Sequence, residues 1–405
     1  RAPGLRVPLI ATVVGALPLG MLGLGLLLYV NELTGSLTDA GMAAGAFGAG
    51  NALGVPLQGR LIDRFGQTAV VAPAGVVCGG WTILLVTTAP TVDSVVFAVA
   101  VSAGAGACVP ATTGSMRVLL AELLEEGQVR AAGYALLAVL FQLALLTGPL
   151  ATSALLAPAE PAGAVATGGI LAAAAGLLFC GTKASRSWQP QRTPSTTGGI
   201  KGQRGLLVLL LIAGGVGISA GFVALAVPAA ALARGNAADS GLLLAVVAAG
   251  EILGGLLFGA RRWRWPSALM LLAALAGSAV AAGLVATAAG SLTLLYPTLF
   301  LTGVCGGPFA IACSSMLDTL APRAALTSSY TLMVSVGLLG SSLGNGVGGA
   351  FVDAAGYRQL LTHNACWLFT LLTTALLLRR ALATQPHPPA ARTVPDASGT
   401  NDIRR

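Results

Sequence analysis

The sequence predicts an all-α integral membrane protein with twelve transmembrane helices in two pseudo-symmetric six-helix bundles. Three observations support this fold class. Of the 405 residues, 55% are hydrophobic and 9% are charged, whereas soluble domains contain about 25% charged residues. The hydrophobic residues form long runs of about the 20 residues that a helix needs to cross a bilayer. The second half of the chain also repeats sequence features of the first half.

Twelve apolar runs are separated by short segments rich in turn-forming residues. Gly, Pro, Asn and Asp cluster between the runs and favour loops there. The runs span residues 8–30, 38–58, 68–88, 93–116, 132–156, 162–182, 205–233, 238–259, 266–288, 291–316, 326–352 and 361–380. The first run is longer than the apolar core of a signal peptide and has no convincing cleavage site, so we expect it to be a retained helix.

The longest internal connection divides the helices six and six. Residues 182–205 are polar, basic and rich in Pro, Gly, Ser and Thr, which is typical of a linker. We therefore predict an N-terminal bundle at 1–181, a cytoplasmic linker at 182–205 and a C-terminal bundle at 206–382. The composition of 383–405 predicts a disordered cytoplasmic tail.

The distribution of basic residues predicts the orientation in the membrane. If the N-terminus is cytoplasmic, twenty of the 22 Arg and Lys residues fall on the cytoplasmic side, and only Arg234 and Arg358 fall outside. The positive-inside rule therefore predicts a cell-membrane protein with both termini in the cytoplasm. The basic residues are scattered between apolar spans, so the net charge of +8 indicates contact with a lipid bilayer and no nucleic-acid partner.

Residue types that carry metal, redox or hydrolytic chemistry are sparse. The six cysteines are Cys78, Cys108, Cys180, Cys305, Cys313 and Cys366. They form no close CxxC pair, and only two histidines accompany them, so we expect core cysteines, no metal and no cofactor. The spans contain no histidine-paired nucleophile and the chain contains no GxxxxGK[ST] motif, which argues against an intramembrane enzyme and against an ATP-driven pump.

The two halves of the sequence align as repeats. A shift of 200 residues places the second apolar run and its following loop on the eighth run. Nine of the 26 positions in 39–64 are then identical without a gap, including Asp39 with Asp239 and Arg64 with Arg264. A second match, at a shift of 196, relates the fifth run to the eleventh. We infer an internal duplication, which is typical of transporter folds.

The segment GRLIDRFGQ, after the second run, carries a family motif. The residues that match the motif are Gly59, Asp63, Arg64 and Gly66. With the twelve spans, the basic central loop and the repeat, they resemble the major facilitator superfamily over nearly the whole chain. The two positions after the motif hold Gln and Thr, which depart from the basic residues often found there. The resemblance implies the fold of that superfamily and transport by alternating access.

The resemblance also implies that this loop is a gate. The carboxylate of Asp63 can accept hydrogen bonds from free amides at the start of a neighbouring helix and face its positive dipole end. In the superfamily the partner is the start of the eleventh helix, and the contact keeps the cytoplasmic side closed. Arg64 is then expected to pair with acid or phosphate groups, while Gly59 and Gly66 allow a tight turn. The alternative is that Arg60 and Arg64 anchor to lipid phosphates and Asp63 is solvated.

Four polar residues inside the spans are candidates for proton coupling or substrate binding. Glu251 is the only acid deep inside a predicted span, and an intramembrane carboxylate is costly, so it is a candidate proton carrier. Gln142 is predicted at a similar depth, and the superfamily packs the fifth helix against the eighth, so we expect a Gln142 to Glu251 hydrogen bond. Asn51, the repeat partner of Glu251, is expected to face the eleventh helix, which carries Asn345. The alternative is a protonated Glu251 with a purely structural role.

The walls of the predicted cavity contain no fixed cation. Superfamily cavities are lined by the first, fourth, seventh and tenth helices. On these helices the cavity candidates are Tyr29, Thr112, Thr113, Ser219, Phe222, Tyr296 and Phe309, together with Ser102, Ser115, Thr298, Phe300 and Thr302. Such walls favour a hydrophobic or amphipathic substrate, cationic if Glu251 contacts it. In the fifth helix, Gly148 and Pro149 partly resemble the superfamily's antiporter signature.

These features predict a monomeric secondary transporter with no enzymatic activity. We expect proton-coupled export of small hydrophobic or amphipathic compounds, as in drug or metabolite efflux. A facilitator or symporter for a neutral small metabolite, with a structural Glu251, is the alternative. A non-transporting membrane sensor or assembly partner is the alternative from another class, although it would not need the repeated loop glycines or Asp63.

Overall fold

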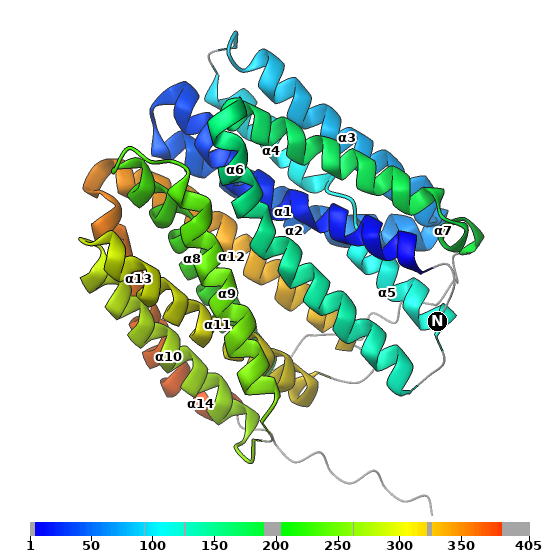
Figure 1. The fold of residues 1–405 in the computed structure, drawn as a ribbon. Coiled ribbons are helices and arrows are strands. Elements are labelled where there is room, and N and C mark those ends of the chain that lie inside the picture. The colour runs from blue at the N-terminus through cyan, green and yellow to red at the C-terminus, as the bar shows by residue number, and fades with distance from the viewer. Residues whose placement is uncertain are drawn as a thin grey trace, which may run out of the picture.

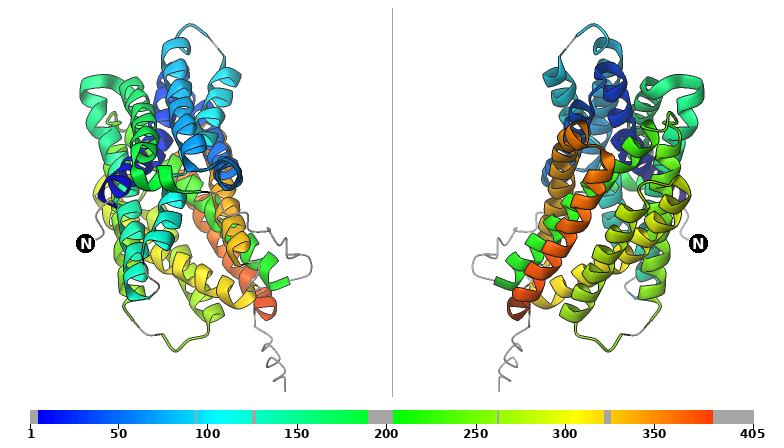
Figure 2. Two further views of the ribbon diagram at one scale, coloured as in Figure 1. Left: turned by 90° about the vertical axis from the view of Figure 1, so that its right-hand side faces the viewer. Right: turned by 90° about the vertical axis from the view of Figure 1, so that its left-hand side faces the viewer.

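The computed structural model shows a helical protein. It describes residues 5–92, 94–124, 127–189, 204–261, 263–321 and 326–382. Within these ranges there is no strand, and the long helices lie side by side (Figure 1). Two further views show the helices running broadly along one direction (Figure 2). The predicted all-α fold is confirmed.

Fourteen helices follow one another in the described parts of the chain. They are α1 (Arg6–Thr34), α2 (Leu37–Phe65), α3 (Gln67–Thr88), α4 (Val95–Ala107), α5 (Thr112–Leu123), α6 (Gln128–Gly181), α7 (Lys183–Ser187), α8 (Arg204–Leu232), α9 (Asp239–Gly259), α10 (Ser267–Ala288), α11 (Leu292–Leu320), α12 (Leu326–Ala355), α13 (Tyr357–Leu377) and α14 (Arg379–Leu382). The short α7 begins the predicted linker. Residues 190–203 and 383–405 lie outside the described residues, and with them most of the linker and the whole predicted tail.

Ten segments in the described parts of the chain are long and apolar enough to cross a membrane. They are α1, α3, α4 with α5, the two parts of α6, α8, α9, α10, α11 and α13. The other two predicted spans, α2 and α12, have 29 and 30 residues and are therefore also long enough. They are less apolar because they pack against each other through Gly, Ala, Ser and Asn, which allow close helix contact.

The fourth predicted span is not one continuous helix. The prediction of a single helix over 93–116 is wrong, because α4 ends at Ala107 and α5 begins at Thr112. Pro110 lies in the break, and proline lacks the amide hydrogen that would continue the helical pattern. The connection between the fifth and sixth spans also differs from the prediction, because a loop was predicted there and the structure has a helix. It stays helical except at Glu160, which has φ 56 and ψ 173.

Gln58 of α2 closes the break between α4 and α5. Its Nε2 donates hydrogen bonds to the carbonyl oxygens of Ala107 (3.0 Å) and Val109 (2.8 Å). Its Oε1 accepts one from the amide of Ala111 (3.1 Å). The side chain is 5% exposed, so these bonds satisfy buried backbone groups that the break leaves free. Gln58 was not predicted as a structural residue. Its sequence signal is a polar Gln within an apolar run. Its repeat partner is Phe258, and α11, the helix of the second half that corresponds to α4 and α5, is unbroken.

We expect Gln58→Leu to lower the free energy of unfolding by about 1–3 kcal/mol, because it leaves two carbonyls and an amide buried without partners. A lower melting temperature of the solubilised protein, followed by tryptophan fluorescence, checks this. The control is Gln359→Leu, at an exposed position on α13, which should melt as the parent does. Equal melting of the two variants would contradict the role of Gln58.

The internal repeat is visible in the packing. In the first half, Gly50 and Gly54 of α2 leave no room for a Cβ against the backbone of α4. In the second half, their repeat partners Gly250 and Gly254 of α9 are packed in the same way against the backbone of α11. The glycines that align in sequence therefore occupy equivalent seams in the two halves.

Three clusters of buried hydrophobic residues form the core. We call the end of the bundle where α1 ends and α2 begins the Asp353 end, and the opposite end, where α2 ends and α3 begins, the Arg60 end. At the Asp353 end, one cluster combines residues from both halves of the chain. At the Arg60 end there are two clusters, one built from residues 5–188 and the other from residues 206–382. The halves thus share a core at one end and have separate cores at the other.

Candidate transport pathway and gates

Asp353, in the last turn of α12, binds the start of α2. Its Oδ2 accepts hydrogen bonds from the amide (2.8 Å) and Oγ1 (2.7 Å) of Thr38 and from Oγ of Ser36 (3.1 Å). Its Oδ1 accepts one from the amide of Leu37 (3.1 Å). The carboxylate faces the positive dipole end of α2 and satisfies amides that the first helical turn leaves free. It therefore joins the two halves at the Asp353 end. Asp353 was not predicted, although its sequence context carries a signal. Gly349, Asp353 and Gly356 have the same spacing as Gly59, Asp63 and Gly66.

Small residues continue this contact along α2 and α12. A Cβ on Gly349 would collide with the backbone of Leu37, and one on Gly41 would lie 3.1 Å from the Cα of Gly349. Deeper in the bundle, Oγ of Ser335 donates a hydrogen bond to the carbonyl of Ala52 (3.3 Å). The contact between the halves therefore extends from the Asp353 end to about the middle of α2.

A second contact between the halves joins α6 to α9. The amide of Gly241 donates a hydrogen bond to Oγ of Ser153 (2.9 Å), and a Cβ on Gly241 would collide with the carbonyl of Pro149. The neighbouring Gly148 packs against α1, where a Cβ on it would lie 2.8 Å from the Cα of Gly20. The predicted motif Gly148–Pro149 thus lies where α6 passes between α1 and α9.

At the Arg60 end, Asp63 has no partner in the described parts of the chain. The prediction that Asp63 lies past the end of its helix is wrong, because α2 stays helical through Phe65 and only Gly66 (φ 91) links it to α3. Asp63 and Arg64 lie in the last turn of α2, and the Asp63 side chain is exposed. A carboxylate at the negative dipole end of its own helix is unfavourable. Residues 322–325, which precede α12, lie outside the described residues.

The two glycines of the loop motif border open space, whereas Arg64 contacts a neighbouring ring. A Cβ on Gly59 or Gly66 would meet nothing within 4 Å. Gly66 needs to be glycine because its φ of 91 is left-handed, whereas Gly59 is helical and has no such need in this conformation. The guanidinium of Arg64 lies beside the ring of Phe65, with Cζ 5.1 Å from the ring centroid.

A small cavity of about 160 Å³ lies among α1, α2, α8, α9 and α12. Its lining residues are Gly20, Gly23, Leu24, Ala44, Ala224, Leu244 and Asn345. Asn345 supplies the one polar side chain of this set, and its Nδ2 donates a hydrogen bond to the carbonyl of Ser341 (3.1 Å). The volume is below the roughly 300–1,000 Å³ of pockets for drug-sized ligands, so the cavity is a narrow, mostly apolar space between the halves.

The predicted cavity residues lie outside the lining of this space. They are Tyr29, Thr112, Thr113, Ser219, Phe222, Tyr296 and Phe309. The hydroxyl of Tyr29 donates a hydrogen bond to the carbonyl of Val86 in α3 (3.2 Å), and Thr112 packs against Gly15 of α1. Phe222 and Tyr296 pack against the shared core cluster, Phe309 belongs to the cluster of residues 206–382, Ser219 is buried and Thr113 is half-buried.

Glu251 lies on the face of α9 that packs against α11. A Cβ on Gly306 of α11 would lie 3.5 Å from Oε1 of Glu251, so this glycine makes room for the carboxylate. The backbones of Gly303 and Gly307 lie against the backbone of Glu251. Neither Glu251 nor the half-buried Gln142 forms a side-chain hydrogen bond or ion pair with any described residue. The expected Gln142 to Glu251 hydrogen bond is therefore absent from the described structure.

Asn51 and Asn345 lie at different depths. Asn51 is buried in α2, next to Ala52, whose carbonyl is level with Ser335 of α12. Asn345 is ten residues further along α12, which corresponds to about 15 Å at 1.5 Å per residue. Asn345 is therefore not the residue of α12 that lies opposite Asn51.

We expect Asp353→Asn to shift the conformational equilibrium about fivefold away from the closed Asp353 end. The amide keeps the size of the side chain but loses the charge and one acceptor, a change of about 1 kcal/mol. Longer distances between spin labels at Glu32 and Arg358, two exposed positions near the contact, check this. Asp318→Asn, at an exposed position near the Arg60 end, is the control and should leave the distance unchanged.

The same contact has an expected pH dependence. Asp353 lies beyond the apolar run 326–352. Burial raises the pKa of Asp353, but hydrogen bonds from Thr38, Leu37 and Ser36 outweigh this and hold the pKa below its ordinary value of 3.8. Because the pKa is lowered, the charged carboxylate stabilises the closed end fully above the ordinary pKa of 3.8. This stabilisation is lost as the pH falls through the lowered pKa of Asp353 in the closed state. The contribution of Asp353 should therefore be constant between about pH 5 and 8. A label distance that changes with pH in this range in the parent but not in Asp353→Asn would contradict it.

Apolar helices long enough to cross a membrane, in two repeated halves that share a core at one end only, are typical of a multi-pass membrane transporter. The chain belongs to the Major Facilitator Superfamily, whose family model matches residues 9–227, more than half of the chain. This confirms the family resemblance and identifies transport of a small-molecule substrate as the class of function. A search of curated proteins finds no significant match.

Solved transporter structures share this fold. The crystal structure of the nucleoside transporter NupG superposes with a TM-score of 0.72 at 12% identity and covers 92% of this chain and 99% of its own. A bacterial homolog to the human lysosomal transporter Spinster, in an inward-facing and occupied conformation, superposes with a TM-score of 0.71 at 15% identity. That match covers 95% of this chain and 98% of the homolog. Identities this low establish a common fold and leave the substrate open.

Proposed function

We propose that this transporter works by alternating access and exports small hydrophobic or amphipathic compounds in exchange for protons. The observation that carries the alternating-access mechanism is the division of the core. The halves share one hydrophobic cluster at the Asp353 end and have separate clusters at the Arg60 end. Two units that are packed internally and joined at one end can exchange that junction for one at the other end.

In this proposal the moving units are the N-terminal bundle, 1–181, and the C-terminal bundle, 206–382, connected by the linker 182–205. The excess of Arg and Lys supports a cytoplasmic Arg60 end in the cell membrane, with both termini on that side. The structure then corresponds to the inward-open state. Both junctions lie within one chain, which supports a monomeric transporter.

Two carboxylates would alternate as latches. Asp353 holds the extracellular side closed by binding the start of α2. In the outward-open state Asp63 would bind the start of α12, whose positive dipole end would offset the unfavourable place of Asp63 at the end of its own helix. Contacts of this kind contribute about 0.3–2 kcal/mol each. Energies of that size bias two states of similar stability without trapping either of them.

The chemistry of the central helices supports the proposed substrate and coupling ion. The cavity is lined by aliphatic residues and Asn345, with no cation among them, which suits an uncharged or cationic apolar compound. Glu251 is an intramembrane carboxylate without a cationic partner among the described residues. A group of this kind can carry a proton across the cycle, because its charged form is costly inside the membrane.

A second candidate is a facilitator or symporter for a neutral metabolite. One observation favours it: Glu251 packs against Gly306 of α11 and is not among the residues that line the central cavity. The polar side chain in that lining is the neutral amide of Asn345. In this case Glu251 would be a structural residue and transport would not depend on a proton gradient.

Transport by the purified protein in liposomes distinguishes the two candidates. A panel of lipophilic cations and neutral metabolites, including nucleosides, is supplied with and without an imposed pH gradient. Accumulation of a lipophilic compound against its gradient, abolished by a protonophore, is the expected result. Transport of a neutral metabolite that is indifferent to the pH gradient would support the facilitator, and flux no higher than in protein-free liposomes for every compound would contradict both.

A further inference from the structure

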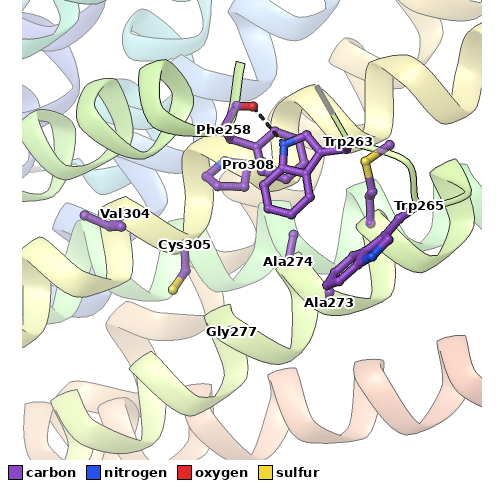
Figure 3. A pocket seen from close by; sticks show the side chains of 10 residues that line it. Phe258, Trp263, Trp265, Ala273, Ala274, Gly277, Val304, Cys305 and Pro308 are labelled. Atoms are coloured by element: carbon purple, nitrogen blue, oxygen red, sulfur yellow. Dashed lines mark hydrogen bonds between the residues drawn. The ribbon is translucent and has the colours of Figure 1, made fainter. Parts of the chain in front are cut away.

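A groove on the second half of the protein shares no lining residue with the cavity between the halves. It has a volume of about 220 Å³ and lies between α9 and α10, with α11 as its floor. Cys305 and Pro308 come from the floor, and Ala273 of α10 is an exposed wall residue. Figure 3 shows the side chains that surround the groove. The exposed wall indicates that the groove opens outward to the surrounding lipid.

Aromatic residues form a rigid rim at the Arg60 end of this groove. The indole Nε1 of Trp263 donates a hydrogen bond to the carbonyl of Phe258 (2.9 Å), and the two rings stack with centroids 4.8 Å apart (Figure 3). Trp265 lies 5.4 Å from Trp263 by ring centroids and is 50% exposed. Tryptophans of this kind concentrate where lipid tails meet head groups. The groove therefore begins at the head-group level and continues toward the apolar core of the bilayer.

The rim also carries positive charge. The guanidinium of Arg261 lies over the ring of Trp263, with Cζ 4.9 Å from the ring centroid, and Arg264 is exposed in the same connection. The segment 258–277 contains three arginines and no acidic residue. An apolar groove with a cationic, aromatic mouth is complementary to an anionic head group attached to an acyl chain.

The groove belongs to the second half of the repeat. In the first half, the ring of Trp81 on α3 packs against α4, where a Cβ on Gly104 would lie 2.9 Å from it. The helices α3 and α10 align at a shift of 200, where the second half has the small, buried Ala281 in place of that tryptophan. Gly277 lines the groove, and a Cβ on it would lie 3.3 Å from Sγ of Cys305. The second half therefore has only small side chains along this part of α10, and the groove stays open beside Gly277.

We propose that this groove holds one acyl chain of an anionic phospholipid whose head group binds Arg261 and Arg264. The volume is smaller than that of a pocket for a drug-sized ligand and suits part of a flexible chain. A chain that moves from the bilayer into the groove gains little from apolar burial, because lipid tails are as apolar as the protein surface. The head group therefore decides which lipid binds, through charge-assisted hydrogen bonds to the two guanidinium groups.

Quenching of tryptophan fluorescence by brominated phospholipids tests this site. In a background with Trp81, Trp188 and Trp367 replaced by Phe, only the two rim tryptophans remain. We expect brominated phosphatidylglycerol to reach half of the maximal quenching at a several-fold lower mole fraction than brominated phosphatidylcholine. Arg261→Gln with Arg264→Gln should make the two lipids equal. Ala273→Phe, which places a ring in the groove, should also remove the preference.

A matched control separates the groove from a general surface effect. Val280→Phe adds the same ring at an exposed position further along α10 and should keep the preference for phosphatidylglycerol. Equal quenching by the two lipids in the parent background, or a preference that survives both the arginine and the Ala273 changes, would overturn the site. Transport is measured on the same samples, so that loss of lipid preference with retained transport is distinguished from misfolding.

Discussion

Glu251→Gln is expected to abolish accumulation driven by a pH gradient while leaving downhill exchange intact. For one proton exchanged per substrate, one pH unit corresponds to about 1.36 kcal/mol and so to a tenfold accumulation ratio. In the variant the ratio should fall to one. Gln has the shape of a protonated Glu and cannot release a proton, so the transporter still changes conformation but no longer couples that change to the gradient. Accumulation and exchange of the same compound in liposomes are the two measurements.

Two further variants make this result specific. Glu122→Gln makes the same chemical change at an exposed position of α5 and should transport as the parent does. Gly306→Ala introduces a methyl group 3.5 Å from the Glu251 carboxylate, an ordinary contact distance, and should retain coupling. Parental accumulation in Glu251→Gln would remove Glu251 from the mechanism and favour the facilitator.

Gly41→Val combined with Gly241→Val is expected to hold the Asp353 end open and to reduce transport by more than about tenfold. A Cβ on Gly41 would lie 2.5 Å from the carbonyl of Asn345, and one on Gly241 would collide with the carbonyl of Pro149. Both carbonyls belong to the other half of the chain. Overpacking typically costs about 1–3 kcal/mol per site, and the halves can relieve it by separating. Longer distances between labels at Glu32 and Arg358, with reduced flux, are the expected readouts.

Two other glycines of α2 serve as controls. A Cβ on Gly59 meets nothing within 4 Å, so Gly59→Val should leave this end closed and affect only closure of the Arg60 end. Gly54 packs against the backbone of Ala107 within its own half, so Gly54→Val should instead lower the yield of folded protein. Unchanged label distances in the Gly41 and Gly241 double variant would show that these glycines do not form the junction.

The helical fold was largely predictable, because a bilayer imposes a simple rule. A span needs about 20 apolar residues with every backbone group bonded inside the helix, and the apolar runs satisfy this directly. The errors fall where a proline or a side chain changes the backbone pattern. Pro110 breaks the fourth span, and Gln58 of another helix bonds to backbone groups that the break leaves free. No local pattern reveals that partnership.

The two carboxylates at the ends of the bundle also show what the sequence predicts and what it does not. The loop motif identified Asp63 as a candidate latch, which remains a prediction. Asp353 was not predicted, although Gly349, Asp353 and Gly356 repeat the spacing of the motif and only its basic residue is missing. What no spacing shows is the partner of Asp353. Its role comes from the start of α2, more than 300 residues away in the chain. Similarly, Asn51 was predicted to face the helix that carries Asn345. The packing of α2 on α12 places the two side chains about 15 Å apart along the helix axis.

The sequence by itself determined the class of this protein: a membrane transporter of twelve predicted spans in two repeated halves, with a family motif between the second and third. Composition, span length and repetition are properties of neighbouring residues and of the surrounding lipid, so they can be read along the chain. Only the tertiary structure decided which end is closed, which carboxylate latches it and where cavities remain. These features depend on contacts between distant segments that differ by a few kcal/mol between states, and such differences leave no local pattern.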